Sequence, residues 1–194
     1  MAARAEAVEG TRHRITAATV RLHEEIGPAA TTVSAIAEEA GVTRLTVYRH
    51  FPDEESLVAA CSAHWRQLHP RPEVDRWRRI TDPLARLRVA LAEMYAWHQS
   101  AAPMEKKILR DLDSMPSFVR DGLAMDMAQR VRVLARGLAT TPAARRRVKP
   151  VVAHALSLST WQALCREGGL STDEAVDIMT AAVLAAAGAA RGTG

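Results

Sequence analysis

The sequence predicts an all-α fold. Ala, Leu, Arg and Glu, which favour helices, recur along the whole 194-residue chain, and runs of β-branched residues are absent. Apolar residues recur at spacings of three and four, and no segment shows the alternation of a strand. With 48% hydrophobic residues, the chain can bury a sizeable core in one or two domains.

Residues that start and stop helices mark the first predicted elements. Residues 1–10 are expected to form a loose tail, Thr11 to cap a helix that runs to Ile26, and Gly27-Pro28 to end it. Capping residues then mark three more helix starts, and a glycine and a proline mark two stops. The starts are Thr32, Thr43 and Asp53, and the stops are Gly41 and Pro52.

The segment around Gly41 predicts a helix-turn-helix. Two short helices that cross steeply need a small residue at their contact, which Ala37 supplies, and a turn glycine four positions later. They also need apolar residues that lock the second helix down, which Val42 and Val47 supply. Such a second helix, here residues 44–50, can lie in the major groove of DNA.

The outward side chains of that second helix are the predicted reading surface. Arg44 can reach a guanine edge or a phosphate, and Tyr48 suits a phosphate. Arg12 and Arg14 could also approach the DNA backbone. The predicted DNA-binding residues are Thr32, Thr43, Arg44, Thr46, Tyr48 and His50.

The run TTVSAIAEEAGVTRLTVYRHFPDEESL resembles the DNA-binding segment of TetR-type regulators, and the likeness covers about residues 11–66. It implies a dimeric transcriptional repressor that leaves operator DNA when a small molecule binds. Two positions depart from the family pattern. Leu45 replaces a small residue and either alters the base contacts or packs inward, and Glu54 replaces a lysine that commonly serves a phosphate.

The Pro-rich stretch at 69–72 predicts a domain boundary, with a helix-turn-helix domain at 11–68 and a helical effector-binding and dimerisation domain at 73–190. Prolines mark the expected starts of its helices: Pro83, Pro103 for a short segment to Leu112, Pro116 for a helix to Ala139, and Pro142. Pro150 either kinks or divides the last of these, which should run to Glu167. The box Ser171–Glu174 opens a final helix to Ala187.

The resemblance implies an effector pocket in the second domain, and an aromatic and Met-rich lining would suit an apolar or aromatic small molecule. Each candidate could instead be ordinary core. The candidates are Met94, Trp97, His98, Met115, Phe118, Met127, Trp161 and Cys165.

Small residues line the last two helices, and the resemblance places a homodimer interface there. The alternative is burial within one subunit. These residues are Ala153, Ser157, Thr160 and Ala163 on one helix and Ala175, Ala182, Ala186 and Ala187 on the other.

Other classes of protein find little support in the sequence. It holds no nucleotide-binding, zinc-protease or hydrolase motif, so neither an enzyme nor a cofactor is expected. Cys61 and Cys165 read as thiols of a cytoplasmic protein, and no apolar run is long enough for a membrane span. The net charge of +4 is not decisive, because residues 1–71 carry eight Arg against nine acidic residues. An activator, or a regulator without a small-molecule effector, remains the alternative function.

Overall fold

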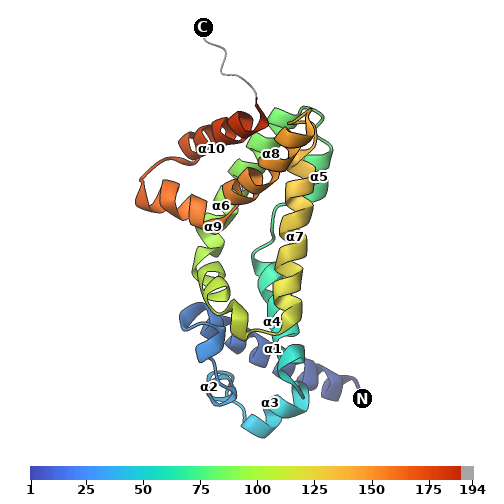
Figure 1. The fold of residues 1–194 in the computed structure, drawn as a ribbon. Coiled ribbons are helices and arrows are strands. Elements are labelled where there is room, and N and C mark those ends of the chain that lie inside the picture. The colour runs from blue at the N-terminus through green and yellow to red at the C-terminus, as the bar shows by residue number, and fades with distance from the viewer. Residues whose placement is uncertain (189–194) are drawn as a thin grey trace. The chain divides into compact units, whose positions relative to one another are not determined.

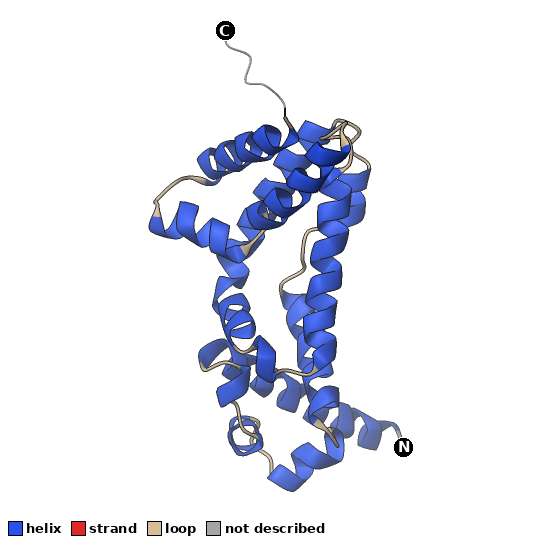
Figure 2. Ribbon diagram, in the orientation of Figure 1, coloured by secondary structure: helices blue, strands red, loops and turns tan. Residues whose placement is uncertain are grey.

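The protein is described by a computed structural model that covers residues 1–188, and every regular element in that range is a helix (Figures 1 and 2). The expected all-α class is therefore confirmed. Contacts divide the chain into two units. The first unit contains Met1–Pro70 and Pro103–Arg120, and the second contains Arg71–Ala102 and the chain from Asp121 onward.

The first unit is built on α1 (Ala2–Glu25), which packs against α2 (Val33–Glu39) and α4 (Glu54–Leu68). Along the chain, the one-turn η1 (Pro28–Ala30) lies between α1 and α2, and α3 (Arg44–His50) lies between α2 and α4. The helix α3 packs against α2. Apolar side chains from all four α-helices form one core, namely Ile15, Ala18, Ile36, Ala37, Ala40, Val47, Phe51 and Leu57.

The expected loose tail at residues 1–10 is wrong, because α1 begins at Ala2. Thr11 therefore lies within the helix instead of capping it, and its hydroxyl donates to the carbonyl oxygen of Ala7. The residues before Thr11 are mostly Ala, Glu and Arg, which are strong helix formers, so propensity extends the helix where no apolar stripe was visible.

The longest helix, α6 (Pro83–Arg110), contributes residues to both units. Its start at Pro83 is as expected, but the separate segment predicted from Pro103 is wrong, because Pro103 lies inside the helix. A proline there removes one helical hydrogen bond, yet the buried neighbours Ala101 and Met104 keep the apolar face continuous. Within α6, the chain passes from the second unit to the first between Ala102 and Pro103.

The second unit also contains α5 (Val74–Arg78), which the sequence pattern did not predict, and α7 (Ser117–Ala135), whose first residues belong to the first unit. The chain continues with α8 (Pro142–Ala155), α9 (Leu158–Trp161), the π-helical η3 (Gln162–Glu167) and α10 (Thr172–Ala187). α8 and α10 pack together around Val148, Val152 and Val183, which are fully buried.

The second unit settles three expectations about helix ends. Pro150 does not divide α8, and the break comes instead at Leu156, after which Ser157 caps α9 by accepting from the N–H of Thr160. The continuous helix to Glu167 is therefore wrong. The box at Ser171 is confirmed, because its hydroxyl accepts from the N–H of Glu174 while the Glu174 carboxylate accepts from the N–H of Ser171.

Candidate nucleic-acid interface

Backbone geometry at Gly41 sets the turn between α2 and α3. Its φ of +64° lies in the left-handed region that glycine adopts without strain. The N–H of Gly41 bonds to the carbonyl oxygen of Glu38 and the N–H of Val42 to that of Ala37, which closes α2 with a Schellman motif. The predicted helix-turn-helix is therefore present with its turn where the sequence placed it.

Threonine side chains start both helices. The Thr32 hydroxyl accepts from the N–H of Ala35 over 3.1 Å, and the Thr43 hydroxyl accepts from the N–H of Thr46 over 3.2 Å. These bonds satisfy backbone groups that a helix start leaves without a partner. Val47, 1% exposed, then anchors the inner face of α3 in the core.

The opposite face of α3 is exposed. Leu45 is 69% exposed and Tyr48 46%, and Arg44 and Arg49 are exposed beside them. Residues 44, 45, 48 and 49 follow the spacing of one helix face. The alternative that Leu45 packs inward is therefore wrong, and its effect on base contacts stays a prediction.

Two of the remaining predicted contact residues are less accessible than the exposed face of α3. Thr46 and His50 are half-buried, and the Thr46 hydroxyl lies 2.9 Å from the Thr43 hydroxyl. Thr32 and Thr43 are exposed. Arg49 was missed by the sequence reasoning, although its spacing of four from Leu45 would have found it.

Arg12 has a structural role that the sequence did not predict. Its Nη1 donates to the carbonyl oxygen of His50 over 2.7 Å, and its guanidinium carbon lies 4.1 Å from the centre of the Phe51 ring. Arg12 is thus held at the end of α3, whereas Arg14 is exposed and donates to Thr11 of its own helix.

Asp53 caps the start of α4, shortly after the end of α3. Its Oδ1 accepts from the N–H of Ser56 over 2.7 Å, and the bonds to Ser56 lower the pKa of its carboxyl. Glu54 follows as the first residue of α4 and is exposed. This end of α4 therefore presents negative charge where the family pattern has a lysine.

The predicted effector-lining residues fall into both units. Met115 and Phe118 belong to the first unit, where Met115 is buried and Phe118 exposed. In the second unit the buried His98 donates from Nε2 to the carbonyl oxygen of Leu156 over 3.0 Å, and two Trp rings lie near its ring, with centroids 5.3 and 6.0 Å away. These rings are Trp97 and Trp161, which are buried like Met94, while Met127 and Cys165 are half-buried.

The small residues predicted to form a dimer interface differ in how far they are buried within this chain. Ala175 and Thr160 are buried within this chain, which agrees with the alternative of burial within one subunit for these two residues. Ala163 is exposed, and the other five are half-buried. No helix within residues 1–188 combines the length and apolar character that a membrane crossing requires.

Comparison with known proteins places the helix-turn-helix in a family. Residues 15–61 match the model of the bacterial regulatory proteins of the tetR family. A comparison with curated proteins finds no match.

Three solved structures share the fold over most of the chain. A Clostridium perfringens protein proposed as a fatty acid metabolism regulator is 17% identical, with a TM-score of 0.65 over 89% of this chain and 97% of its own. A tetR-family transcriptional regulator from Streptomyces coelicolor is 18% identical, with a TM-score of 0.63 over 92% and 80%. NalD of Pseudomonas aeruginosa, the secondary repressor of the MexAB-OprM multidrug efflux pump, is 20% identical, with a TM-score of 0.56 over 97% and 100%.

The family match covers α2 and α3 and parts of α1 and α4, so it includes the exposed face of α3. The fold shared with the solved structures extends to the second unit. The chain thus carries the N-terminal DNA-binding domain of the tetR family of bacterial regulatory proteins, and over most of its length it shares the fold of solved regulators.

Proposed function

We propose that the protein is a repressor that binds a pseudo-palindromic operator as a homodimer and leaves it when a small molecule binds. The observation that carries the proposal is the exposed face of α3, where Arg44, Tyr48 and Arg49 surround Leu45. Arginine suits a guanine edge or a phosphate, and a tyrosine hydroxyl suits a phosphate. Thr32, Thr43, Thr46 and His50 complete the proposed contact surface.

The proposed homodimer forms through the last two helices. On α10 the exposed residues Ile178, Ala181 and Ala185 are spaced by three and four, so they lie along one side of the helix. Ile178 is 47% exposed, and small neighbours allow another helix to approach closely. Pairing two copies there would form a four-helix bundle and give the two recognition helices a fixed separation.

Release by a ligand follows from that separation. Half-sites one turn of DNA apart require recognition helices about 34–36 Å apart. An apolar or aromatic effector bound among Met94, Trp97, Trp161 and their neighbours would favour a different separation, and linkage then lowers the affinity for DNA.

Two measurements on the protein's own promoter DNA test the proposal. Fluorescence anisotropy should show affinity that falls steeply with salt, because phosphate contacts release counterions. In vitro transcription from that promoter should decrease when the protein is added. Affinity independent of salt would contradict DNA binding by this face, and increased transcription would favour the activator instead.

A further inference from the structure

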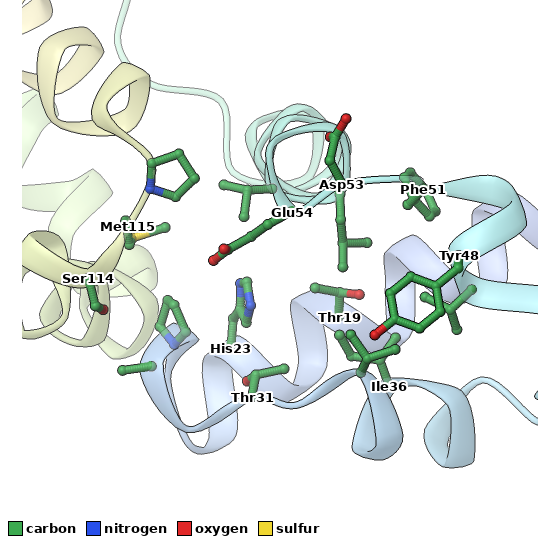
Figure 3. A pocket seen from close by; sticks show the side chains of 17 residues that line it. Thr19, His23, Thr31, Ile36, Tyr48, Phe51, Asp53, Glu54, Ser114 and Met115 are labelled. Carbon is green, nitrogen blue, oxygen red and sulfur yellow. The ribbon is translucent and has the colours of Figure 1, made fainter. Parts of the chain in front are cut away.

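The first unit contains a cavity of about 470 Å³ that the proposed function does not use. Its walls come from α1, η1, α2, α3 and α4 and from residues 114–116, and all of them belong to the first unit (Figure 3). Pockets that bind small molecules commonly have volumes of roughly 300–1,000 Å³, so a cavity of this size can hold a small ligand. The cavity is separate from the effector pocket proposed for the second unit.

The charged groups of the cavity are acidic. Asp53 and Glu54 contribute carboxylates, and no Lys or Arg of the described chain lines the walls. Asp53 is engaged as the cap of α4, but Glu54 has neither an ion pair nor a hydrogen bond with any side chain that the structure describes. An anion would be repelled here, while a cation would find an unpaired carboxylate.

His23 adds a neutral hydrogen-bond acceptor. The side chain is 5% exposed, and its Nδ1 lies 3.7 Å from the Cys61 sulfur. When the single S–H of Cys61 donates to the carbonyl oxygen of Val58, the sulfur accepts from Nδ1–H and Nε2 keeps its lone pair. No hydrogen bond to this Nε2 is made by any residue between 1 and 188.

Burial keeps both groups in these forms at neutral pH. It lowers the pKa of His23 to about 4, against the weaker opposing effect of Asp111, and raises the pKa of Cys61 to about 12. His23 thus stays neutral and Cys61 stays protonated. Figure 3 shows the His23 ring and the Glu54 carboxylate directed toward the same space.

The rest of the wall is mainly apolar. Ile36, Phe51 and Leu57 line it from the helix-turn-helix side, and Met115 lines it from the opposite segment. We infer that this cavity binds a small primary ammonium ion with an attached apolar group, which donates to Glu54 and to Nε2 of His23 while the apolar group fills the wall of Phe51, Leu57 and Met115.

The inferred site gives a role to Glu54, where this chain departs from the resemblance. A lysine at that position would repel an ammonium ion and would serve a phosphate instead. With glutamate, the start of α4 gains a carboxylate that faces the cavity. Tyr48 of the DNA-reading helix lines the same cavity, so the site lies next to the DNA-binding surface.

Isothermal titration calorimetry of the full chain at pH 7 tests the inference with two probes of equal shape. 2-Phenylethylamine carries the ammonium group, and 2-phenylethanol is its neutral counterpart. We expect one amine per chain, with the alcohol bound at least roughly tenfold more weakly, because the alcohol lacks the charge that strengthens the hydrogen bond to Glu54.

The matched variants are Glu54→Gln and Glu55→Gln. Both remove one exposed carboxylate from the first turn of α4, but only Glu54 lines the cavity. Glu54→Gln should abolish the preference for the amine, and Glu55→Gln should retain it. Absence of amine binding, equal binding of amine and alcohol, or equal effects of the two variants would overturn the inference. DNA binding is measured separately, so failure here leaves the proposed function standing.

Discussion

Arg12 of α1 donates from Nη1 to the carbonyl oxygen of His50, the last residue of α3, over 2.7 Å. The carbonyl groups at a helix C-terminus carry partial negative charge, so a guanidinium is favourable there. The same guanidinium lies 4.1 Å from the centre of the buried Phe51 ring. Arg12 thereby joins the first helix of the unit to the end of α3.

Replacing Arg12 by alanine should lower the free energy of unfolding by about 1–2 kcal/mol, since both the charged hydrogen bond and the ring contact are lost. Affinity for promoter DNA should fall as well, because α3 loses a contact that fixes its last turn. Urea unfolding and anisotropy measure the two effects. Arg14→Ala removes the same charge from an exposed position on the same helix. If Arg14→Ala matched Arg12→Ala in both assays, the contact with His50 would have no positioning role.

Acidification should destabilise the protein through His23. The unfolded side chain takes up a proton below its ordinary pKa of 6.5, but the folded side chain does so only below about 4, because burial opposes the charge. Between these values the unfolded state binds more protons than the folded state. The contribution of His23 to the free energy of unfolding is therefore fully present above pH 6.5 and is lost as the pH drops toward 4. Between pH 7 and pH 5 the contribution of this group falls by roughly 2 kcal/mol.

Urea unfolding at pH 7 and pH 5 measures that difference. His23→Gln should flatten the pH dependence in this window, while His64→Gln, which alters a half-buried histidine, should leave it in place. An unchanged slope in His23→Gln would show that other groups cause the loss.

The turn glycine can be tested with a matched pair. Gly41 and Gly169 have φ values of +64° and +69°, and a Cβ added at either would meet no atom within 4 Å. Alanine at either position should therefore cost roughly 1 kcal/mol of unfolding free energy through backbone strain alone. Only Gly41→Ala should also weaken DNA binding, because that strain lies in the turn that sets the direction of α3. Equal DNA affinity for the two variants would argue that the turn tolerates the strain.

Arg49 is predicted to contact phosphate. Arg49→Ala should weaken binding to promoter DNA and to unrelated DNA by the same factor, and it should reduce the slope of log affinity against log salt by about one. Anisotropy titrations over a series of salt concentrations measure both effects. A loss confined to promoter DNA would indicate that Arg49 reads a base.

The sequence predicted the helix-turn-helix correctly because its signals are local. The caps at Thr32 and Thr43, the left-handed turn at Gly41 and the buried Val47 are each specified within a few residues. The capping box at Ser171 is specified in the same way. Local backbone requirements of this kind can be read from a single sequence.

The errors arose where distant packing or plain propensity decides the structure. Pro103 suggested a helix start, but it lies inside α6, where its neighbours on the apolar face are buried. Residues 1–10 lack an apolar stripe, yet Ala and Glu extend α1 through them. The bond of Arg12 to His50 was not predicted, because the two residues are 38 positions apart and spacing along one helix does not show such a contact.

The central claim is that the exposed face of α3 binds DNA, and the most direct test compares the affinities of single variants for promoter DNA by fluorescence anisotropy. Arg44→Ala should weaken binding by about 1–3 kcal/mol if Arg44 reads a guanine, and Tyr48→Phe should weaken it through loss of a phosphate contact. Arg66→Ala, which removes an exposed arginine from α4, is the control and should bind like the unaltered protein. If Arg44→Ala and Tyr48→Phe also bound like the unaltered protein, α3 would not be the DNA-reading helix.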